Sequence, residues 1–255
     1  MIVLAVDTSG KNGSLALVRV DDHLTTPPTS DPTSPKRGEM WGTNSPSRFE
    51  TLELVPLAGR MYSAQLIPEL QKALARQNLK KADIDAYAVA SGPGSFTGLR
   101  VGLSTVKALS EVMHKPIAAV SVLEAAARMT AVPGHVLVTL DAGRKQLFVG
   151  DYEFDEAFKV IEAQESLVSS EPIFAKGAEV WGSKFPIFSP DQAVRDAAAL
   201  RGVTVSDIAM PQADMFARIG YEKIVRGETT PAETLEANYI RASDAELFSL
   251  PKLIS

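Results

Sequence analysis

The order of apolar and polar residues predicts a chain of alternating strands and helices. An apolar run rich in β-branched residues at 2–6 ends at Asp7, which indicates a buried strand. A polar turn at 8–13 leads into a second such run at 14–20, close enough to form a hairpin. Further strands are expected at 49–57, 86–90, 117–120, 136–140, 146–153 and 158–163.

Helical periodicity fills several of the intervals between these strands. Leu66, Leu70 and Leu74 recur every four residues within 62–77, although Pro68 removes one helix hydrogen bond and predicts a kink or a restart. Other helices are expected at 99–114, 123–129, 191–200 and 211–226. Strands that alternate with helices are typical of an α/β fold.

The first strand-and-turn pattern occurs twice. The run VLAVD that ends at Asp7, followed by a turn and LALV, is echoed by LVTLD ending at Asp141, a turn and LFV. The two aspartates lie about half the chain apart, which predicts a duplicated domain. We therefore expect an N-terminal half at 1–132 and a smaller C-terminal half at 133–255, whose last helix packs back on the first half.

Two interpretations of these aspartates are open. In one, Asp7 and Asp141 project from strand ends into a shared cleft and meet phosphate-bound magnesium or a water. In the other, each aspartate begins a turn by bonding its own backbone. The spacing alone does not favour either one.

Composition and charge narrow the class of protein. The chain has 255 residues, of which 45 % are apolar, so it can bury the core of one or two domains. Its net charge is −5, which disfavours nucleic-acid binding by the chain on its own. No apolar run approaches the roughly 18 residues of a membrane span, and the apolar start is too short for a signal peptide. A cytoplasmic protein that does not bind membranes is therefore expected.

The supply of metal ligands and nucleophiles is limited. The chain has no cysteine, which excludes disulfides, thiolate catalysis and thiolate zinc sites. Its histidines are His23, His114 and His135, and no two are close enough for an HxxxH or HExxH pair. Any metal would therefore have to be held mostly by oxygen ligands.

The segment at 22–48 interrupts the pattern of strands and helices. It contains five prolines among serines and threonines, which is typical of a solvated loop. The alternative is a partner-binding arm, in which Trp41 would be the one large apolar anchor.

A glycine-rich string, SGPGSFTGLR at 91–100, carries the most specific signal. Its glycines leave backbone amides uncovered before a helix, where the helix dipole and Arg100 could hold an anion. The spacing differs from a Walker A loop, from GxGxxG and from GxSxG. A purely structural strand-to-helix turn at 92–98 is the alternative. Candidate nucleotide-binding or anion-binding residues are Asp7, Thr8, Gly92, Gly94, Ser95, Thr97, Gly98, Arg100 and Asp141.

The helix after this string has an unusually wide apolar face. Gly102 inside it costs about 1 kcal/mol relative to alanine, which indicates that another backbone comes close. The face serves either the core or a protein–protein interface. Its members are Gly98, Gly102, Thr105, Leu109 and Val112.

Several strings together resemble one known family. IVLAVDTS at 2–9, SGPGSFTGLRVGL at 91–103 and VSVLE at 120–124 are similar to the TsaB (YeaZ) proteins, bacterial non-catalytic relatives of the glycoprotease-like TsaD proteins. The similarity is close over 1–20 and 60–150 and loose beyond, where YIR at 239–241 matches a C-terminal signature. It implies an actin/hexokinase/Hsp70-like (ribonuclease H-like) fold with duplicated domains and mixed sheets flanked by helices.

The resemblance also implies a function. TsaB proteins support the complex that adds threonylcarbamoyl to N6 of adenosine 37 in ANN-decoding tRNAs, with TsaD as the catalytic subunit, a TsaE-type ATPase and TsaC as the source of the adenylate. It implies no catalytic residue and no metal site in this chain, no required cofactor, weak ATP or ADP binding at most, tRNA contact only through the complex, and a homodimer when alone. The partner interface is expected at Tyr62, Leu66, Leu70, Leu74, Gly98, Gly102, Thr105, Leu109 and Val112.

The chain departs from the family at two places, and other functions remain open. Tyr62-Ser63 replaces a frequent His-Ser at the start of the first helix, and the loop at 22–48 is longer than usual. A metallopeptidase or a small-molecule kinase of the same fold is the alternative enzyme class. A stand-alone tRNA binder is a third hypothesis, which the negative charge disfavours.

Overall fold

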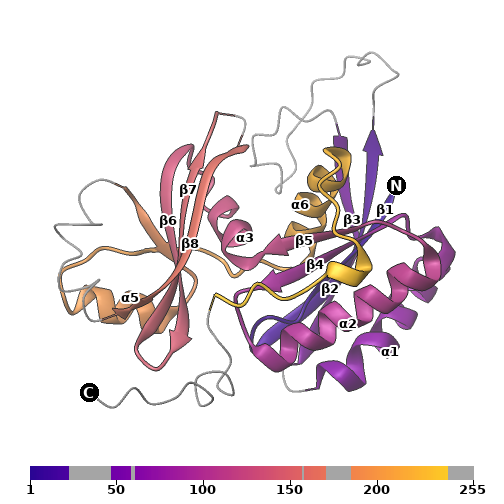
Figure 1. The fold of residues 1–255 in the computed structure, drawn as a ribbon, viewed down its shortest axis with the longest axis horizontal. Helices are drawn as coiled ribbons and strands as arrows, with labels where there is room; N and C mark the ends of the chain where they lie inside the picture. Colours follow the sequence, from indigo (N-terminus) through magenta and orange to yellow (C-terminus); the bar gives the residue numbers. More distant parts are fainter. Residues whose placement is uncertain (23–46, 59–60, 157, 171–184, 241–255) are drawn as a thin grey trace.

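The computed structural model describes residues 1–22, 47–58, 61–156, 158–170 and 185–240, which form two five-stranded sheets (Figure 1). The strand order of the first sheet is β3-β2-β1-β4-β5, and that of the second is β8-β7-β6-β9-β10. The first sheet contains β1 (Ile2–Asp7), β2 (Asn12–Asp22), β3 (Ser47–Ala58), β4 (Ala86–Gly92) and β5 (Ile117–Ser121). The second contains β6 (Gly134–Gly143), β7 (Gln146–Phe154), β8 (Val160–Ser169), β9 (Ile187–Ser189) and β10 (Ser206–Asp207).

The two sheets share one topology. In each, a central strand pairs antiparallel with the strand that follows it and parallel with a later one: β1 with β2 and β4, and β6 with β7 and β9. The edge strands also correspond. β3 lies beyond β2 as β8 lies beyond β7, and β5 lies beyond β4 as β10 lies beyond β9. The duplicated α/β arrangement predicted from the repeated strand and aspartate is therefore confirmed. The predicted boundary between 132 and 133 stays a prediction.

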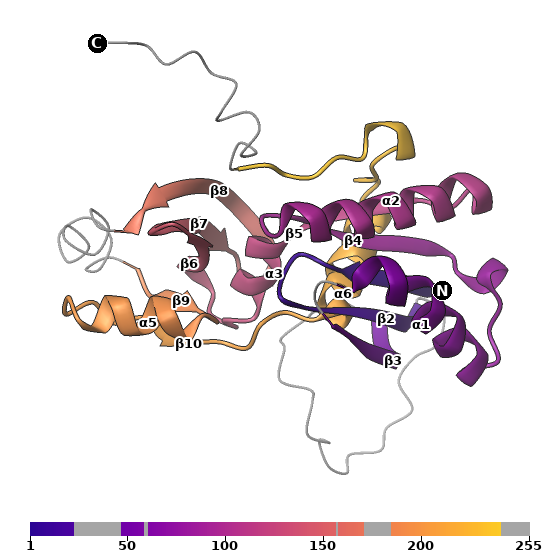
Figure 2. The same cartoon turned by 90° about the horizontal axis from the view of Figure 1, so that it is seen from below.

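Helices cover both faces of the first sheet. The helices α1 (Tyr62–Arg76) and α2 (Phe96–Met113) lie side by side on one face, and α6 (Ala213–Val225) crosses the other (Figures 1 and 2). The short helix α3 (Val122–Arg128) packs between the two sheets, and α5 (Gln192–Ala199) covers the second. Two 3-10 turns complete the described part, η1 (Lys81–Asp83) and η2 (Ala232–Thr234).

Side chains along β1 point alternately to the two faces of the first sheet, which explains why helices cover both faces. Leu4 and Val6 join the core under α1 and α2, whereas Val3 and Ala5 join the core under α6. All six residues of β1 are buried, as expected for a strand with helices on both sides. The start of α6 is fixed to the first hairpin because the Ala213 amide donates a 2.9 Å hydrogen bond to the Ser14 hydroxyl.

Two helices differ from the predicted ones. The helix α1 runs unbroken through Pro68, so the predicted restart is wrong; Pro68 and Ala64 are both exposed, and the carbonyl left without a donor can bond water. The helix α2 begins at Phe96 rather than Leu99, because the Ser95 hydroxyl caps it.

Two other expectations concern the membrane and the long loop. Within the described residues, no helix combines the length and hydropathy that a bilayer crossing requires. The predicted loop at 22–48 lies largely outside the described residues, as does Trp41.

Two buried tyrosines provide a test of the core. The Tyr87 hydroxyl on β4 is buried and has no hydrogen-bond partner among the described residues, whereas the Tyr152 hydroxyl on β7 donates to the Glu165 carboxylate. Leaving a buried hydroxyl unpaired costs about 1–3 kcal/mol. We therefore expect Tyr87→Phe to leave the free energy of unfolding equal or higher, and Tyr152→Phe to lower it by about 1–3 kcal/mol. Urea unfolding of both variants checks this, and a loss of stability in Tyr87→Phe would show that its hydroxyl has a partner.

Candidate functional site

The first aspartate forms a buried turn at the end of β1. Asp7 is only 5 % exposed, and its Oδ1 accepts hydrogen bonds from the Ser9 amide at 2.8 Å and the Ser9 hydroxyl at 2.6 Å. Burial raises the pKa of the Asp7 carboxyl, and the two bonds from Ser9 oppose that rise. The carboxylate is thus engaged by its own turn.

The second aspartate makes the same turn in an exposed position. Asp141 Oδ1 accepts a 2.8 Å bond from the Gly143 amide, again two residues further on, and the Asp141 amide donates to the Asp191 carboxylate at 2.8 Å. Both aspartates therefore form the local turn that was one of their two interpretations. Asp7 lies next to Thr8, which bonds α2, whereas Asp141 bonds Asp191 at the start of α5. The roles of the two aspartates toward a ligand stay a prediction.

The helix α2 packs directly on the turn that follows β1. The Thr8 hydroxyl donates to the Gly98 carbonyl at 2.7 Å, and the Ser95 amide donates to the Ser9 carbonyl at 2.6 Å. A Cβ atom at Gly98 would lie less than 3.0 Å from the Thr8 carbonyl, and one at Gly102 would lie equally close to the Thr8 hydroxyl. The close approach expected at Gly102 is thus made by the chain itself, so neither glycine offers a surface to a partner.

The rest of the glycine-rich string divides into a buried and an exposed part. Gly92 is buried with φ at +116°, a conformation that glycine adopts without strain. Gly94, Ser95, Thr97 and Arg100 are exposed around the first turn of α2. The predicted 92–98 loop is shorter than expected because its last three residues are helical. Anion binding by the exposed residues stays a prediction.

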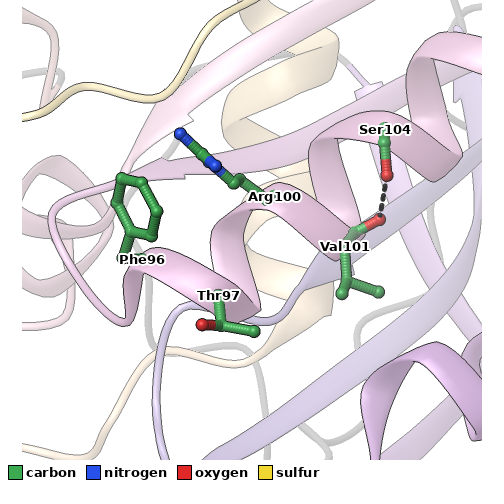
Figure 3. A pocket seen from close by; sticks show the side chains of 5 residues that line it. All are labelled: Phe96, Thr97, Arg100, Val101 and Ser104. Carbon is green, nitrogen blue, oxygen red and sulfur yellow. Dashed lines mark hydrogen bonds between the residues drawn. The ribbon is translucent and has the colours of Figure 1, made fainter. Parts of the chain in front are cut away.

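Arg100 is held by two aromatic side chains. Its guanidinium carbon lies 3.8 Å from the centroid of the Phe96 ring, and its Nε donates to the Tyr239 hydroxyl at 3.2 Å. The Phe96 and Tyr239 rings also contact each other, with centroids 5.1 Å apart. Beside them lies an open hollow of about 310 Å³ (Figure 3). It is lined by Phe96, Thr97, Arg100, Val101 and Ser104.

The predicted interface residues of α1 face inward. Leu66, Leu70 and Leu74 are buried in the core between α1 and the first sheet, so they are not available to a partner. On α2, Thr105 and Leu109 are half-buried, and Val112 is 75 % exposed. An interface on these helices must therefore use their outward residues, such as Ile67 and Val112, and the inward leucines hold the helix in place.

Tyr62, at the start of α1, stands where the TsaB (YeaZ) proteins often have a histidine, and its side chain contacts the turn that follows β1. Its hydroxyl donates to the Gly10 carbonyl at 2.9 Å, and its ring lies against Gly13. Burial, with the Asp7 charge, raises the pKa of Tyr62 to about 12. The side chain is buried and closes the turn from the α1 side, which is a structural role rather than a contact to a partner.

One cluster near this site was not predicted from the sequence. Glu165 on β8 accepts hydrogen bonds from the Ser121 and Tyr152 hydroxyls and from the Asn238 side chain. These four residues come from four separate segments. The family strings could have drawn attention to two of them, because VSVLE contains Ser121 and YIR follows Asn238. Within the described ranges, no group of three or more His, Asp or Glu side chains is placed to hold a metal ion.

Comparison with known proteins relates this arrangement to one family. The family model described as TsaD, tRNA N6-adenosine threonylcarbamoyltransferase, matches residues 55–234. The chain belongs to this family. Its relatives include proteins named tRNA threonylcarbamoyladenosine biosynthesis protein TsaB, so the predicted TsaB (YeaZ) resemblance is confirmed.

The TsaB relatives extend over most of the chain. The Escherichia coli (strain K12) protein is 26 % identical over 196 residues, covering 72 % of this chain and 83 % of the relative. The Bacillus subtilis (strain 168) protein is 25 % identical over 252 residues, covering 96 % of each. The solved structure of YeaZ from Pseudomonas aeruginosa superposes with a TM-score of 0.65 at 20 % identity, over 94 % of this chain and all of that one. The expected fold of duplicated mixed sheets flanked by helices is confirmed.

The contact between α2 and the first turn can be tested at Gly102. Thr8 is buried and bonded to Gly98, so it cannot move aside for a new Cβ without losing that bond. We expect Gly102→Ala to lower the free energy of unfolding by up to about 2 kcal/mol, because the usual overpacking cost of about 1–3 kcal/mol is offset by the roughly 1 kcal/mol that alanine gains over glycine in a helix. The matched control is Ser104→Ala on the exposed side of the same helix, where alanine gains about 0.5 kcal/mol of helix propensity. Urea unfolding measures both, and equal stabilisation of the two variants would refute the close contact.

The burial of Asp7 predicts a pH dependence of stability. Since the folded pKa lies above the ordinary value of 3.8, folding is penalised above the folded pKa, and the penalty is relieved as the pH falls toward 3.8. The amide oxygen of an asparagine side chain can accept the same bonds from Ser9 without carrying a charge. We expect Asp7→Asn to be more stable than the wild type at pH 7, with a difference that shrinks as the pH is lowered. Urea midpoints at several pH values check this, and a difference independent of pH would contradict it.

Proposed function

We propose that the chain is a non-catalytic scaffold subunit of the complex that adds threonylcarbamoyl to N6 of adenosine 37 in ANN-decoding tRNAs. The observation that carries this proposal is the end-to-end similarity to the Bacillus subtilis protein named for tRNA threonylcarbamoyladenosine biosynthesis, which covers 96 % of both chains. The family model, which carries the name of the transferase, supports the same pathway. A cytoplasmic location goes with this role.

The hydrogen bonds of Asp7 and Asp141 within their own turns support a role other than catalysis. The Asp7 carboxylate is buried and bonded by Ser9, and Asp141 is bonded by Gly143. The three histidines are far apart in the sequence. These aspartates maintain turns, so we assign the transfer reaction to a TsaD-type catalytic subunit that this chain binds and supports.

The outward face of α1 and α2 is our proposed contact for that subunit. The two helices lie side by side, and their inward residues are fixed in the core, so the face is a rigid platform. Ile67 on α1 and Val112 on α2 expose large apolar side chains there, 39 % and 75 % exposed. We propose that a second copy of the chain uses the same face when the catalytic subunit is absent, and that a TsaE-type ATPase joins the assembled pair.

The remaining partners follow from charge. With a net charge of −5, the isolated chain is a poor ligand for a phosphate backbone, so we propose that tRNA is held only by the assembled complex. No cofactor is required of this chain in that scheme. Weak ATP or ADP binding at the exposed start of α2, around Arg100, is compatible with it.

Reconstitution tests the function and the interface together. The modification reaction is assembled from TsaC-, TsaD- and TsaE-type proteins and tRNA, with and without this chain, and the modified nucleoside is measured. We expect product only when the chain is present, and at least tenfold less with Ile67→Arg, since a charge on the contact face costs at least about 1.4 kcal/mol of binding. Leu200→Arg makes the same change at an 87 % exposed position beside α5 and should act as wild type.

Two results would count against the proposal. Equal product without the chain would remove its role in the pathway, and modification by the chain alone would make it an enzyme. Equal loss in Ile67→Arg and Leu200→Arg would leave the pathway role intact but would move the interface away from α1 and α2.

A further inference from the structure

The chain after α6 returns along the first sheet to the start of α2. The Thr230 amide donates to the Ile117 carbonyl at 2.8 Å, the η2 turn follows, and Leu235 is buried in the core beneath α2. The next residues cross the carboxyl end of β4. We call residues 235–240 the C-terminal strap; Figure 2 shows it running beside α2 toward β8 of the second sheet.

One residue of the strap bonds both sheets. The Asn238 amide donates to the carbonyl of Ser91 on β4 at 2.7 Å, and the Asn238 side chain donates to Oε2 of Glu165 on β8 at 2.9 Å. The Asn238 carbonyl also lies against Gly92. The strap is therefore a cross-link between the first sheet and the second.

The other oxygen of the same carboxylate makes a second link. Glu165 Oε1 accepts bonds from the hydroxyls of Ser121, at the end of β5, and Tyr152, on β7. Ser121 in turn caps α3, since its hydroxyl accepts a 3.1 Å bond from the Leu123 amide. Glu165 thus joins both sheets, the strap and the helix between the sheets through one carboxylate.

The outer end of the strap rests on exposed groups of α2. Tyr239 contacts the Phe96 ring and accepts the bond from Arg100, and these three side chains form what we call the clasp. Phe96 is 37 % and Tyr239 is 43 % exposed, and Phe96 and Arg100 also line the hollow on α2. Exposed contacts of this kind are weak, so the clasp can be exchanged for contacts to another molecule.

We propose that the strap is a latch that fixes the two sheets relative to each other, and that a protein bound at the hollow opens it by taking Phe96 and Arg100 from Tyr239. The second half of this inference rests on the function proposed above, since the hollow lies on α2, one of the two helices assigned to the partner. Linkage makes the effect reciprocal: a partner that prefers the open latch binds more tightly to a chain whose strap is already released.

The absence of cysteine from the sequence makes the latch measurable in the full chain. Spin labels are placed at Lys81→Cys in η1 and Glu162→Cys in β8, two exposed positions beside different sheets, and their distance distribution is recorded by pulsed electron resonance. We expect one narrow distribution in the otherwise wild-type chain. Asn238→Ala/Tyr239→Ala should broaden it, whereas Glu236→Ala, an exposed change on the same strap, should leave it narrow.

A milder variant separates release of the strap from unfolding of the whole chain, which could also broaden the distance distribution of the double variant. Tyr239→Phe keeps the ring contact with Phe96 and removes only the acceptor for Arg100. Amide hydrogen exchange at Asn238 should be at least threefold faster in this variant than in Glu236→Ala, while the exchange of β1 amides is unchanged. Unchanged exchange at Asn238, or a distribution in the double variant as narrow as that of the control, overturns the latch.

Adding the purified TsaD-type partner to the labelled chain tests the coupling. The distribution should broaden on binding, and Tyr239→Phe should bind at least threefold more tightly. Binding that leaves the distribution narrow overturns the coupling. No binding at all counts against the proposed function instead, while the variants of the free chain still decide whether the strap is a latch.

Discussion

The contact between the α2 backbone and the turn after β1 determines where almost every other feature lies. Two hydrogen bonds and two glycines without side chains bring the helix onto Thr8 and Ser9. This position sets the direction in which Phe96 and Arg100 project, and it places α2 beside α1 on the sheet. The hollow and the resting place of Tyr239 follow from it.

Local pattern was sufficient for β1 to β8 and for the duplication, but it did not predict the short strands β9 and β10. β-branched apolar runs are buried on both faces wherever helices cover a sheet, and a repeated strand–aspartate–turn unit reports a repeated topology. It was not sufficient for the function of Asp7, because a ligand-binding aspartate and a turn-forming aspartate occupy the same place at a strand end. The bonds from Ser9 show that Asp7 forms the turn, and its role toward a ligand stays a prediction.

The interface residues show a second limit of pattern. A leucine every four residues on α1 predicts an apolar stripe, but it does not say which surface covers that stripe. In the structure the first sheet covers it, and Leu66 and Leu70 are buried in the core between α1 and that sheet. The strap was beyond prediction for a different reason. Asn238 and Glu165 are 73 residues apart, and Tyr239 and Arg100 are 139 apart, so no local periodicity connects them. Only the folded backbone brings such pairs together.

The role of Gly98 and Gly102 also bears on how the glycine-rich string should be used to classify sequences. These glycines are needed for a steric fit between a helix and a turn, which is a condition for folding and is independent of any reaction. A search that depends on this string therefore selects chains able to build the same junction, whether they are enzymes or supporting subunits. Chemistry within the family has to be assigned from the side chains around the junction, position by position.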